Sequence, residues 1–364
     1  MKRRHLLPAV VGIAMLAATA TAFGQVAPAG YPADYATLIA NAKKEGKVVI
    51  YTSTDAKQAA PLVDAFKQAY PGVDVEVNDL GTNGSYNRAI SEAAARQVGS
   101  DLVWTSAMDL QMVLVEKGLA DTYASPETKN LPAWGQFKNI LYGTTLEPSA
   151  ILYNKKLFPA EWVPKSRAEL IKVLKDRKEP LKGKIASFDP EKSGTGFFFA
   201  TADLRHTNDF WDLVAAFGAA EGKVYGSSGA MREKIVSGEH VMAFNVIGSY
   251  ALEWARENPN LGVAFQQDYT STFSRVVNIS KGAPHPNAAR LFLDFMLSEK
   301  GQKALADKGV PSIRSDVGTL NAASLNKLVG GGLKPTPVDA ELTHYMDPKR
   351  RAEFFQQWKK SLGR

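Results

Sequence analysis

Residues 46–55, GKVVIYTSTD, join a short apolar strand to a hydroxyl-rich turn. Apolar side chains at helical spacing follow in 59–70, and Pro71-Gly72 ends that helix. The unit then recurs, with strands expected at 73–77 and 102–104 and helices expected at 86–96 and 109–117. Strands that alternate with helices of this length predict an α/β fold, with mostly parallel sheets flanked by helices.

The segment 142–158 departs from this pattern, because Gly143-Thr144-Thr145 and Glu147-Pro148 interrupt an extended run. We interpret it as a strand that crosses between two lobes. A second series follows, with helices expected at 166–175, 196–204, 209–217, 230–237 and 249–258 and strands at 184–188 and 241–246. Strands at 261–266 and 274–279 are expected to return to the first lobe, ahead of a helix at 287–308.

The first residues have the pattern of a secretory signal peptide. Lys2, Arg3 and Arg4 precede an apolar run at 6–20, and small residues follow it. An uncleaved membrane anchor is the alternative, but the run is shorter than the ~20 residues that a span needs. We therefore expect a cleaved signal and a periplasmic protein.

These expectations divide the chain into four parts. Residues 1–24 are the signal peptide, 25–145 with about 263–316 form lobe 1, 146–262 form lobe 2, and 317–364 form a C-terminal helical tail that packs on the lobes. The tail ends in a helix expected at 348–362.

Composition excludes several classes of function. The chain has no cysteine, which rules out disulfides, thiolate metal sites and a lipid-attachment cysteine. Its net charge of +7 comes from dispersed basic residues, so nucleic acid is not expected as a partner. No G-x-S-x-G or H-E-x-x-H motif occurs, and the four histidines after the signal are far apart in sequence. We expect no catalytic residue, no metal ligand and no cofactor.

Three strand-to-helix turns carry small hydroxyl residues and glycines, at 52–54, 105–108 and 193–196. In open sheets, ligands bind at the carboxyl ends of strands, where helix N-termini add partial positive charge. The alternative is ordinary helix capping, which favours the same residue types. The candidate ligand-binding residues are Ser53, Thr54, Asp55, Ser85, Ser106, Ala107, Thr145, Glu147, Ser193, Gly194, Thr195, Gly196, Asn245 and Tyr250, with Ser227-Ser228-Gly229 as further candidates.

The order of these segments resembles the bacterial extracellular solute-binding proteins of ABC importers. The export signal is followed by VVIYTS at 48–53, AYPGV at 69–73, SDLVW at 100–104, SGTG at 193–196 and KGAPHPNAA at 281–289. Within these proteins the chain is most similar to the branch that binds ferric ion, hexose phosphates and phosphonates. The resemblance implies a type II periplasmic-binding fold, two lobes joined by crossing strands, closure on a ligand by a hinge, and delivery to an inner-membrane ABC permease. It also implies a monomer that is not an enzyme.

The chain departs from the ferric members of that branch at their ligand positions. Those members carry a histidine in the first turn, where this chain has Thr54-Asp55, and a tyrosine pair, where it has Ile247-Gly248. Residues 78–80, 86–88 and 106–111 resemble the hexose-phosphate-binding relatives. The resemblance therefore implies a small organic anion, with a sugar phosphate or other organophosphate first, a carboxylate next and ferric ion third. A secreted hydrolase or lyase that uses Asp55, Asp109 or Glu147 is the competing class.

Overall fold

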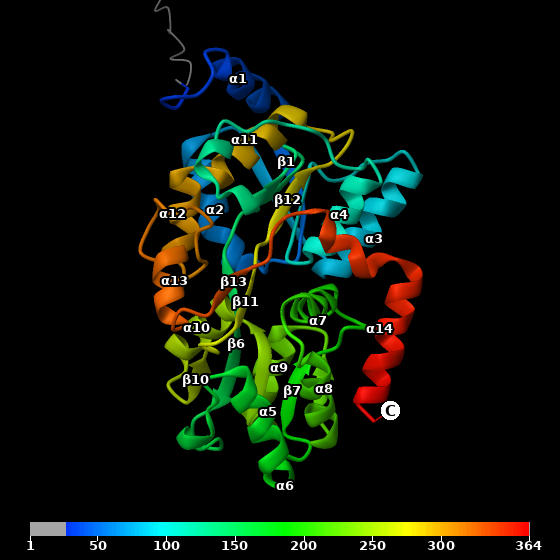
Figure 1. Cartoon of the computed structure of the whole chain (residues 1–364). Helices are drawn as coiled ribbons and strands as arrows, with labels where there is room; N and C mark the ends of the chain where they lie inside the picture. Colours follow the sequence, from blue (N-terminus) through cyan, green and yellow to red (C-terminus); the bar gives the residue numbers. More distant parts are fainter. Residues whose placement is uncertain (1–26, 364) are drawn as a thin grey trace, which may run out of the picture.

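The computed structural model describes residues 27–363, so the predicted signal peptide lies outside the described residues. The described chain forms two lobes, one above the other in Figure 1, each built on a sheet flanked by helices. The predicted two-lobe α/β fold is thereby confirmed. Within 27–363, no helix has the length and apolarity that crossing a membrane requires.

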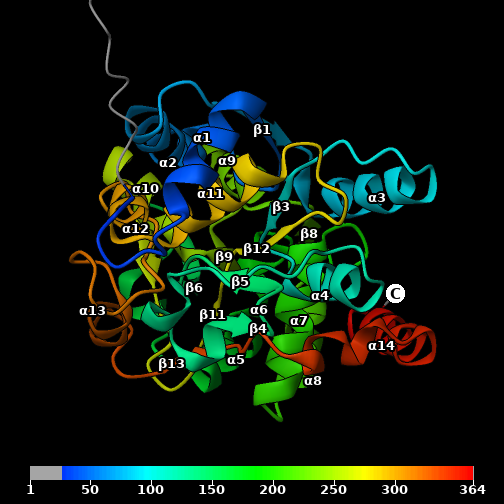
Figure 2. The same ribbon diagram turned by 90° about the horizontal axis from the view of Figure 1, so that it is seen from above.

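The first lobe contains a six-stranded sheet in the order β2-β1-β3-β12-β5-β4. The strands are β1 (Lys47–Thr52), β2 (Asp74–Asp79), β3 (Leu102–Thr105), β4 (Gln136–Phe137), β5 (Leu141–Gly143) and β12 (Val276–Ile279). The helices of this lobe are α1 (Tyr35–Glu45), α2 (Ala56–Ala69), α3 (Gly81–Ala94), α4 (Met108–Glu116), α11 (Pro286–Leu297) and α12 (Glu299–Ala306), with the short 3-10 helices η1 (Thr128–Asn130) and η2 (Ala133–Gly135). Seen from above, α3 and α4 lie on one side of this lobe and α12 on the other (Figure 2).

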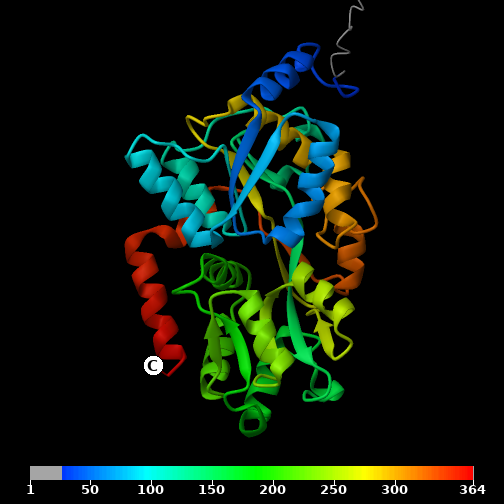
Figure 3. The ribbon, with the colours of Figure 1, turned by 180° about the vertical axis from the view of Figure 1, so that it is seen from behind.

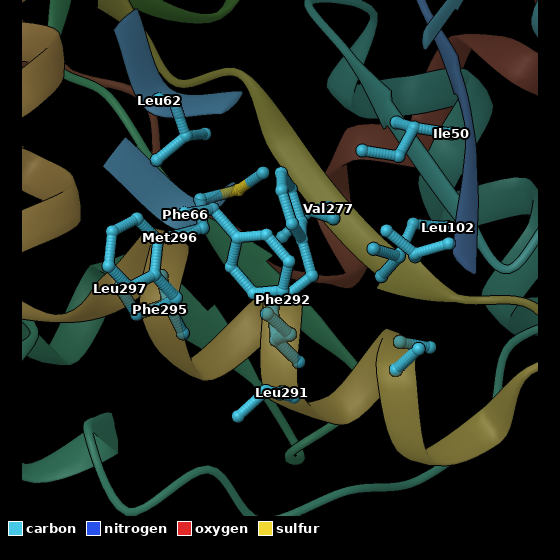
Figure 4. Close-up of a cluster of buried hydrophobic side chains, with 14 of the residues drawn as sticks. Ile50, Leu62, Phe66, Leu102, Val277, Leu291, Phe292, Phe295, Met296 and Leu297 are labelled. Carbon is cyan, nitrogen blue, oxygen red and sulfur yellow. The ribbon is translucent and has the colours of Figure 1, made fainter. Parts of the chain in front are cut away.

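Aromatic rings fill the core between the first sheet and α2 and α11. Phe66 of α2 meets Phe292 and Phe295 of α11 at ring-centroid distances of 4.9 and 5.5 Å, as Figure 4 shows. Ile50, Leu102 and Val277 of the sheet are buried in the same cluster. Burial of such side chains stabilises a fold by roughly 1.5–3 kcal/mol each, so this core holds α2 and α11 against the first sheet.

The second lobe contains a sheet in the order β13-β11-β6-β9-β7-β8, and β10 also pairs with β6. The strands are β6 (Glu147–Asn154), β7 (Ile185–Phe188), β8 (Lys223–Tyr225), β9 (Met242–Ile247), β10 (Leu261–Ala264), β11 (Thr270–Phe273) and β13 (Leu333–Pro335). The helices are η3 (Ala160–Trp162), α5 (Arg167–Asp176), α6 (Lys178–Leu181), α7 (Gly194–His206), α8 (Phe210–Ala219), α9 (Ser228–Ser237) and α10 (Gly248–Glu257).

The segment from β5 to β6 crosses between the lobes, as predicted, because β5 belongs to the first sheet and β6 to the second. The crossing strands run against their neighbours: β12 is antiparallel to β3 and β5, and β6 is antiparallel to β9, β10 and β11. Both sheets are therefore mixed, and the prediction of mostly parallel sheets was wrong in this respect.

Three further expectations about single elements were wrong. The strand expected at 261–266 does not return to the first lobe: a short turn after α10 reverses the chain, and β10 pairs with β6 in the second sheet. The helix expected at 287–308 breaks at Ser298, whose extended backbone ends α11 and whose Oγ accepts the Gly301 N–H to cap α12. The helix expected at 86–96 already begins at Gly81.

The C-terminal segment comprises α13 (Ala322–Leu328), β13, η4 (Ala340–Met346) and α14 (Pro348–Ser361). It touches both lobes: η4 packs on α4, while α14 packs on α8, and Figure 3 shows this segment in orange to red. The Thr343 hydroxyl donates to Glu116 in the first lobe, and Asp339 pairs with Arg205 in the second.

Candidate functional site

A cavity of about 310 Å³ lies between the two lobes. The first lobe lines it with Ser53, Asp55, Asp79, Gly81, Thr82 and Ser106, and the second lobe lines it with Phe188, Ser193, Thr195, Gly226, Ser227, Ser228, Gly229, Ile247, Tyr250 and Trp254. Its volume is in the range of small-molecule sites. Six of the predicted site residues line it, namely Ser53, Asp55, Ser106, Ser193, Thr195 and Tyr250, and so do the further candidates Ser227, Ser228 and Gly229.

Three hydroxyl side chains form a chain across this cavity. The Oγ atoms of Ser53 and Ser106, which follow β1 and β3, lie 3.3 Å apart, and the Ser106 N–H donates to Ser53 Oγ at 3.1 Å. Ser106 Oγ lies 2.9 Å from Thr195 Oγ1 in the first turn of α7. This row of hydrogen-bonded hydroxyls thus links the first lobe to the second. Because hydroxyls both donate and accept, it can present donors to a ligand from either lobe.

Helices from both lobes begin at this cavity. Asp55, Ser193 and Ser227 are the N-caps of α2, α7 and α9, and each side chain accepts an N–H from the first turn of its helix. The capping alternative is therefore correct for Asp55 and Ser193, yet both residues also line the cavity. A cap satisfies only some of the four N–H groups that a helix start leaves without an intrahelical partner. The remaining N–H groups and the helix dipoles favour an anionic group here.

Two stacked aromatic rings of α10 form one wall of the cavity. The rings of Tyr250 and Trp254 lie 5.5 Å apart at an interplanar angle of 14°. The Arg275 guanidinium lies 5.3 Å from the Tyr250 ring, and that of Arg232 lies 5.5 Å from the Trp254 ring. Burial raises the pKa of the Tyr250 phenol, and Arg275 only partly offsets this rise. The phenol is therefore protonated near neutral pH and is a hydrogen-bonding group rather than an anionic one.

Three predicted site residues lie behind the cavity wall instead of lining it, and they surround Arg275. Its guanidinium pairs with Glu147 at 2.7 Å and donates to Thr54 Oγ1 at 2.9 Å. Thr145 Oγ1 donates to Glu147 and accepts the Arg275 backbone N–H. Burial lowers the pKa of Arg275, but Glu147, Tyr250 and Asp55 together outweigh burial and raise it overall, so the cation stays charged. Thr54, Thr145 and Glu147 thus satisfy a buried arginine.

The other predicted residues have structural partners or lie elsewhere. Ser85 Oγ donates to the Thr52 carbonyl, and Ala107 is buried ahead of α4. Gly194 and Gly196 lie in the first turn of α7, where added Cβ atoms would meet neighbouring atoms at 2.7–2.8 Å. Asn245 has a left-handed backbone and lies in a separate small cavity beside Arg167.

Several cavity residues were missed. Asp79 is the last residue of β2, beside the end of β1 that Ser53 follows, so its position at a strand end was the available signal. Gly81 and Thr82 were missed because α3 begins earlier than its apolar pattern indicates. Trp254 lies one helical turn beyond Tyr250, a spacing that places both rings on one face of α10.

The cavity contains oxygen donors of several kinds. Its carboxylates are those of Asp55 and Asp79, and Tyr250 supplies its phenol. Across residues 27–363, His, Cys, Asp and Glu side chains form no group of three that could hold a metal ion. A second cavity, of about 210 Å³, lies under η4 and contains none of the predicted residues.

Comparison with known proteins places this geometry in context. Residues 61–327 match the model of a family described as bacterial extracellular solute-binding protein. The structure is similar to the substrate-binding protein of an ABC transporter from Agrobacterium tumefaciens, with 33% identity, a TM-score of 0.82, and coverage of 87% of this chain and 94% of that one.

Two more distant structures share the fold. The periplasmic binding protein AfuA from Actinobacillus pleuropneumoniae, with fructose-6-phosphate bound, is 22% identical with a TM-score of 0.70, over 87% of this chain and 99% of that one. Iron-bound HitA from Pseudomonas aeruginosa is 20% identical with a TM-score of 0.66, over 86% of this chain and 99% of that one.

Proposed function

Because the chain belongs to the bacterial extracellular solute-binding proteins, we propose that it carries a small organic anion through the periplasm to the permease of an ABC importer. A sugar phosphate or another organophosphate is the favoured ligand. Export depends on the predicted signal peptide at residues 1–24.

One observation carries the choice of ligand: helices from both lobes begin at a single cavity that is also lined by hydroxyls, two carboxylates and an aromatic wall. The starts of α7 and α9 suit the phosphate, because their N–H groups and dipoles favour negative charge. The carboxylates of Asp55 and Asp79 suit the sugar, whose hydroxyls can donate to them. The faces of Tyr250 and Trp254 suit the less polar side of the ring. An organophosphate uses all three kinds of contact.

Ferric ion fits the cavity less well. It needs several anionic oxygen or nitrogen donors that converge on one point, and phenolate donors require deprotonated tyrosine. Here Tyr250 supplies one phenol to the cavity, and the position of a tyrosine pair is occupied by Ile247 and Gly248. AfuA and HitA are each less than 25% identical to this chain, so our preference for an organophosphate over ferric ion rests on the donors of the cavity.

Contacts that already join the lobes across the cavity support closure as the mode of binding. Lys57 of α2 pairs with Glu253 of α10 at 2.9 Å, and the Asn83 amide donates to the Lys192 carbonyl at 3.0 Å. A ligand that contacts both lobes adds to these interactions only when the lobes are together, and therefore favours the closed arrangement.

We also propose that the protein has no catalytic activity. A hydrolase needs an acid and a base that converge on one bond. Asp55 caps α2, and Asp109 is fully buried outside the cavity. Glu147 is buried in an ion pair with Arg275, so its carboxylate does not face the cavity.

A thermal-shift screen tests this function. The panel contains sugar phosphates, phosphonates, dicarboxylates, the matching unphosphorylated sugars and ferric citrate. At a hundredfold excess over the Kd, a ligand stabilises the folded state by about 2.7 kcal/mol, which gives a clear rise in Tm. We expect the rise with an organophosphate and not with its unphosphorylated counterpart. A large shift with ferric citrate and none with any organic anion would refute the proposal.

A further inference from the structure

Two of the connections between the lobes are joined to each other by hydrogen bonds. One runs from β5 to β6 through Thr144 and Thr145, and the other runs from β11 to β12 through Ser274 and Arg275. The Thr144 N–H donates to the Arg275 carbonyl at 2.8 Å, and the Arg275 N–H donates to Thr145 Oγ1 at 2.8 Å. The Thr145 N–H donates to Ser274 Oγ at 3.1 Å. These segments therefore form one unit rather than two independent linkers.

The Arg275 side chain reaches from this unit into both lobes. Its guanidinium holds Glu147, at the start of β6, through two contacts of 2.7 and 3.0 Å, and only 2% of the arginine side chain is exposed. The remaining N–H groups donate to Thr54 Oγ1 at 2.9 Å and to Gln58 Oε1 at 2.6 Å, both in the first lobe at the start of α2. Tyr250 of the second lobe lies over the guanidinium at 5.3 Å.

Two other buried arginines form ion pairs within a single lobe, so they can serve as controls for the loss of a buried ion pair. Arg167 pairs with Asp203 and Asp209, both in the second lobe. Arg314 pairs with Glu127 and Asp316 on the side of the first lobe. Their side chains are 4% and 5% exposed, so they match Arg275 in burial and in kind of partner. Arg275 differs from them in contacting groups of both lobes.

We infer that Arg275 and Glu147 are a positioning pair that couples closure of the lobes to the shape of the ligand cavity. If the lobes separate about their connections, the guanidinium must leave either Thr54 and Gln58 or Glu147 and Tyr250. Either loss leaves a buried charged group with an unsatisfied donor, which is costly. The pair therefore favours one arrangement of the lobes. In that arrangement Thr54 holds its neighbours Ser53 and Asp55 at the cavity, and Arg275 supports the wall at Tyr250.

The inference rests on the proposed function only for its effect on affinity, because the arrangement of the lobes can be measured without a ligand. The chain has no cysteine, so Lys67→Cys and Lys172→Cys place one spin label on each lobe, at exposed positions of α2 and α5. The distribution of distances between the two labels is measured in the labelled protein without further change. It is then measured in the labelled protein that also carries Arg275→Lys, and in the one that carries the matched control Arg167→Lys. Gln58→Met is added, because it removes one first-lobe acceptor and leaves the ion pair intact.

We expect Arg275→Lys to broaden the distribution of distances without ligand, Gln58→Met to broaden it less, and Arg167→Lys to leave it unchanged while lowering the Tm. With fructose 6-phosphate as the probe, affinity falls about tenfold or more in Arg275→Lys, within the usual range of coupling between sites, and less than twofold in Arg167→Lys. Distributions that are the same for Arg275→Lys and Arg167→Lys would overturn the inference. If Arg275→Lys does not fold, an unchanged distribution in Gln58→Met overturns it. Failure of any organophosphate to bind the unaltered protein refutes the proposed function alone.

Discussion

Gly194 lies where the first turn of α7 meets the first lobe, and its replacement by alanine should hold the lobes apart. An added Cβ would lie 2.8 Å from Asn83 Oδ1 and from Leu110 Cδ1, and 2.9 Å from Thr82 Oγ1. Ordinary contacts of a Cβ atom are 3.4–4 Å. All three neighbours are side-chain ends on α3 and α4 of the first lobe, so the clash is relieved by shifting those side chains, by moving the lobes apart by roughly half an ångström or more, or by both.

Overpacking of this kind costs about 1–3 kcal/mol. If that cost falls on the closed arrangement, ligand affinity decreases by roughly 5- to 150-fold. Isothermal titration calorimetry measures it, with the organophosphate that gives the largest thermal shift. Gly226→Ala is the matched control, because Gly226 also lines the cavity but has no atom within 4 Å of an added Cβ. Equal affinity of Gly194→Ala and the unaltered protein would refute the reasoning that closure brings α7 against α3 and α4.

Three further changes test single interactions. Thr195→Val keeps the side-chain volume but removes the 2.9 Å bond to Ser106, so affinity should fall about fivefold for a loss of about 1 kcal/mol; unchanged affinity in calorimetry would exclude a role for this hydroxyl. Burial raises the pKa of Asp109 from 3.8 to about 7, so its contribution to stability is fully present below pH 3.8 and is lost as the pH rises through about 7, by at most about 1.4 kcal/mol per pH unit. In urea unfolding, the free energy of unfolding of Asp109→Asn minus that of the unaltered protein should therefore increase from pH 5 to pH 8. The same difference in unfolding free energy at both pH values would contradict the raised pKa of Asp109. Ser298→Ala removes the cap of α12 and should lower the free energy of unfolding by about 1 kcal/mol, whereas no change would show that the cap contributes nothing.

The sequence predicts which turns line the cavity better than it predicts which residues contact one another behind it. Ser53, Ser106 and Thr195 follow a local rule, because small hydroxyl residues at the carboxyl ends of strands come together when the sheet forms. The roles of Thr54 and Glu147 could not be read in this way. Both bind Arg275, which lies 221 and 128 residues away in sequence, and only the crossing of the chain between lobes brings the three together.

The predicted ends of helices were wrong where a single residue sets the boundary. Ser298 interrupts a run of helical periodicity, and its capping bond to Gly301 is a local choice that the apolar pattern does not record. Gly81 begins α3 within the polar stretch GTNGS, which has weak helix propensity. Contacts with the rest of the first lobe override that propensity, and they also bring Thr82 to the cavity.

The most direct test of the central claim is calorimetry with a matched pair of ligands, the organophosphate that stabilises the protein most and the same compound without its phosphate. Because the phosphate would receive charge-assisted hydrogen bonds from the starts of α7 and α9 and from hydroxyls of both lobes, its removal should weaken binding by about a hundredfold or more. Equal affinity for the two compounds would contradict the account, since it would mean that the helix starts at the cavity do not bind an anion.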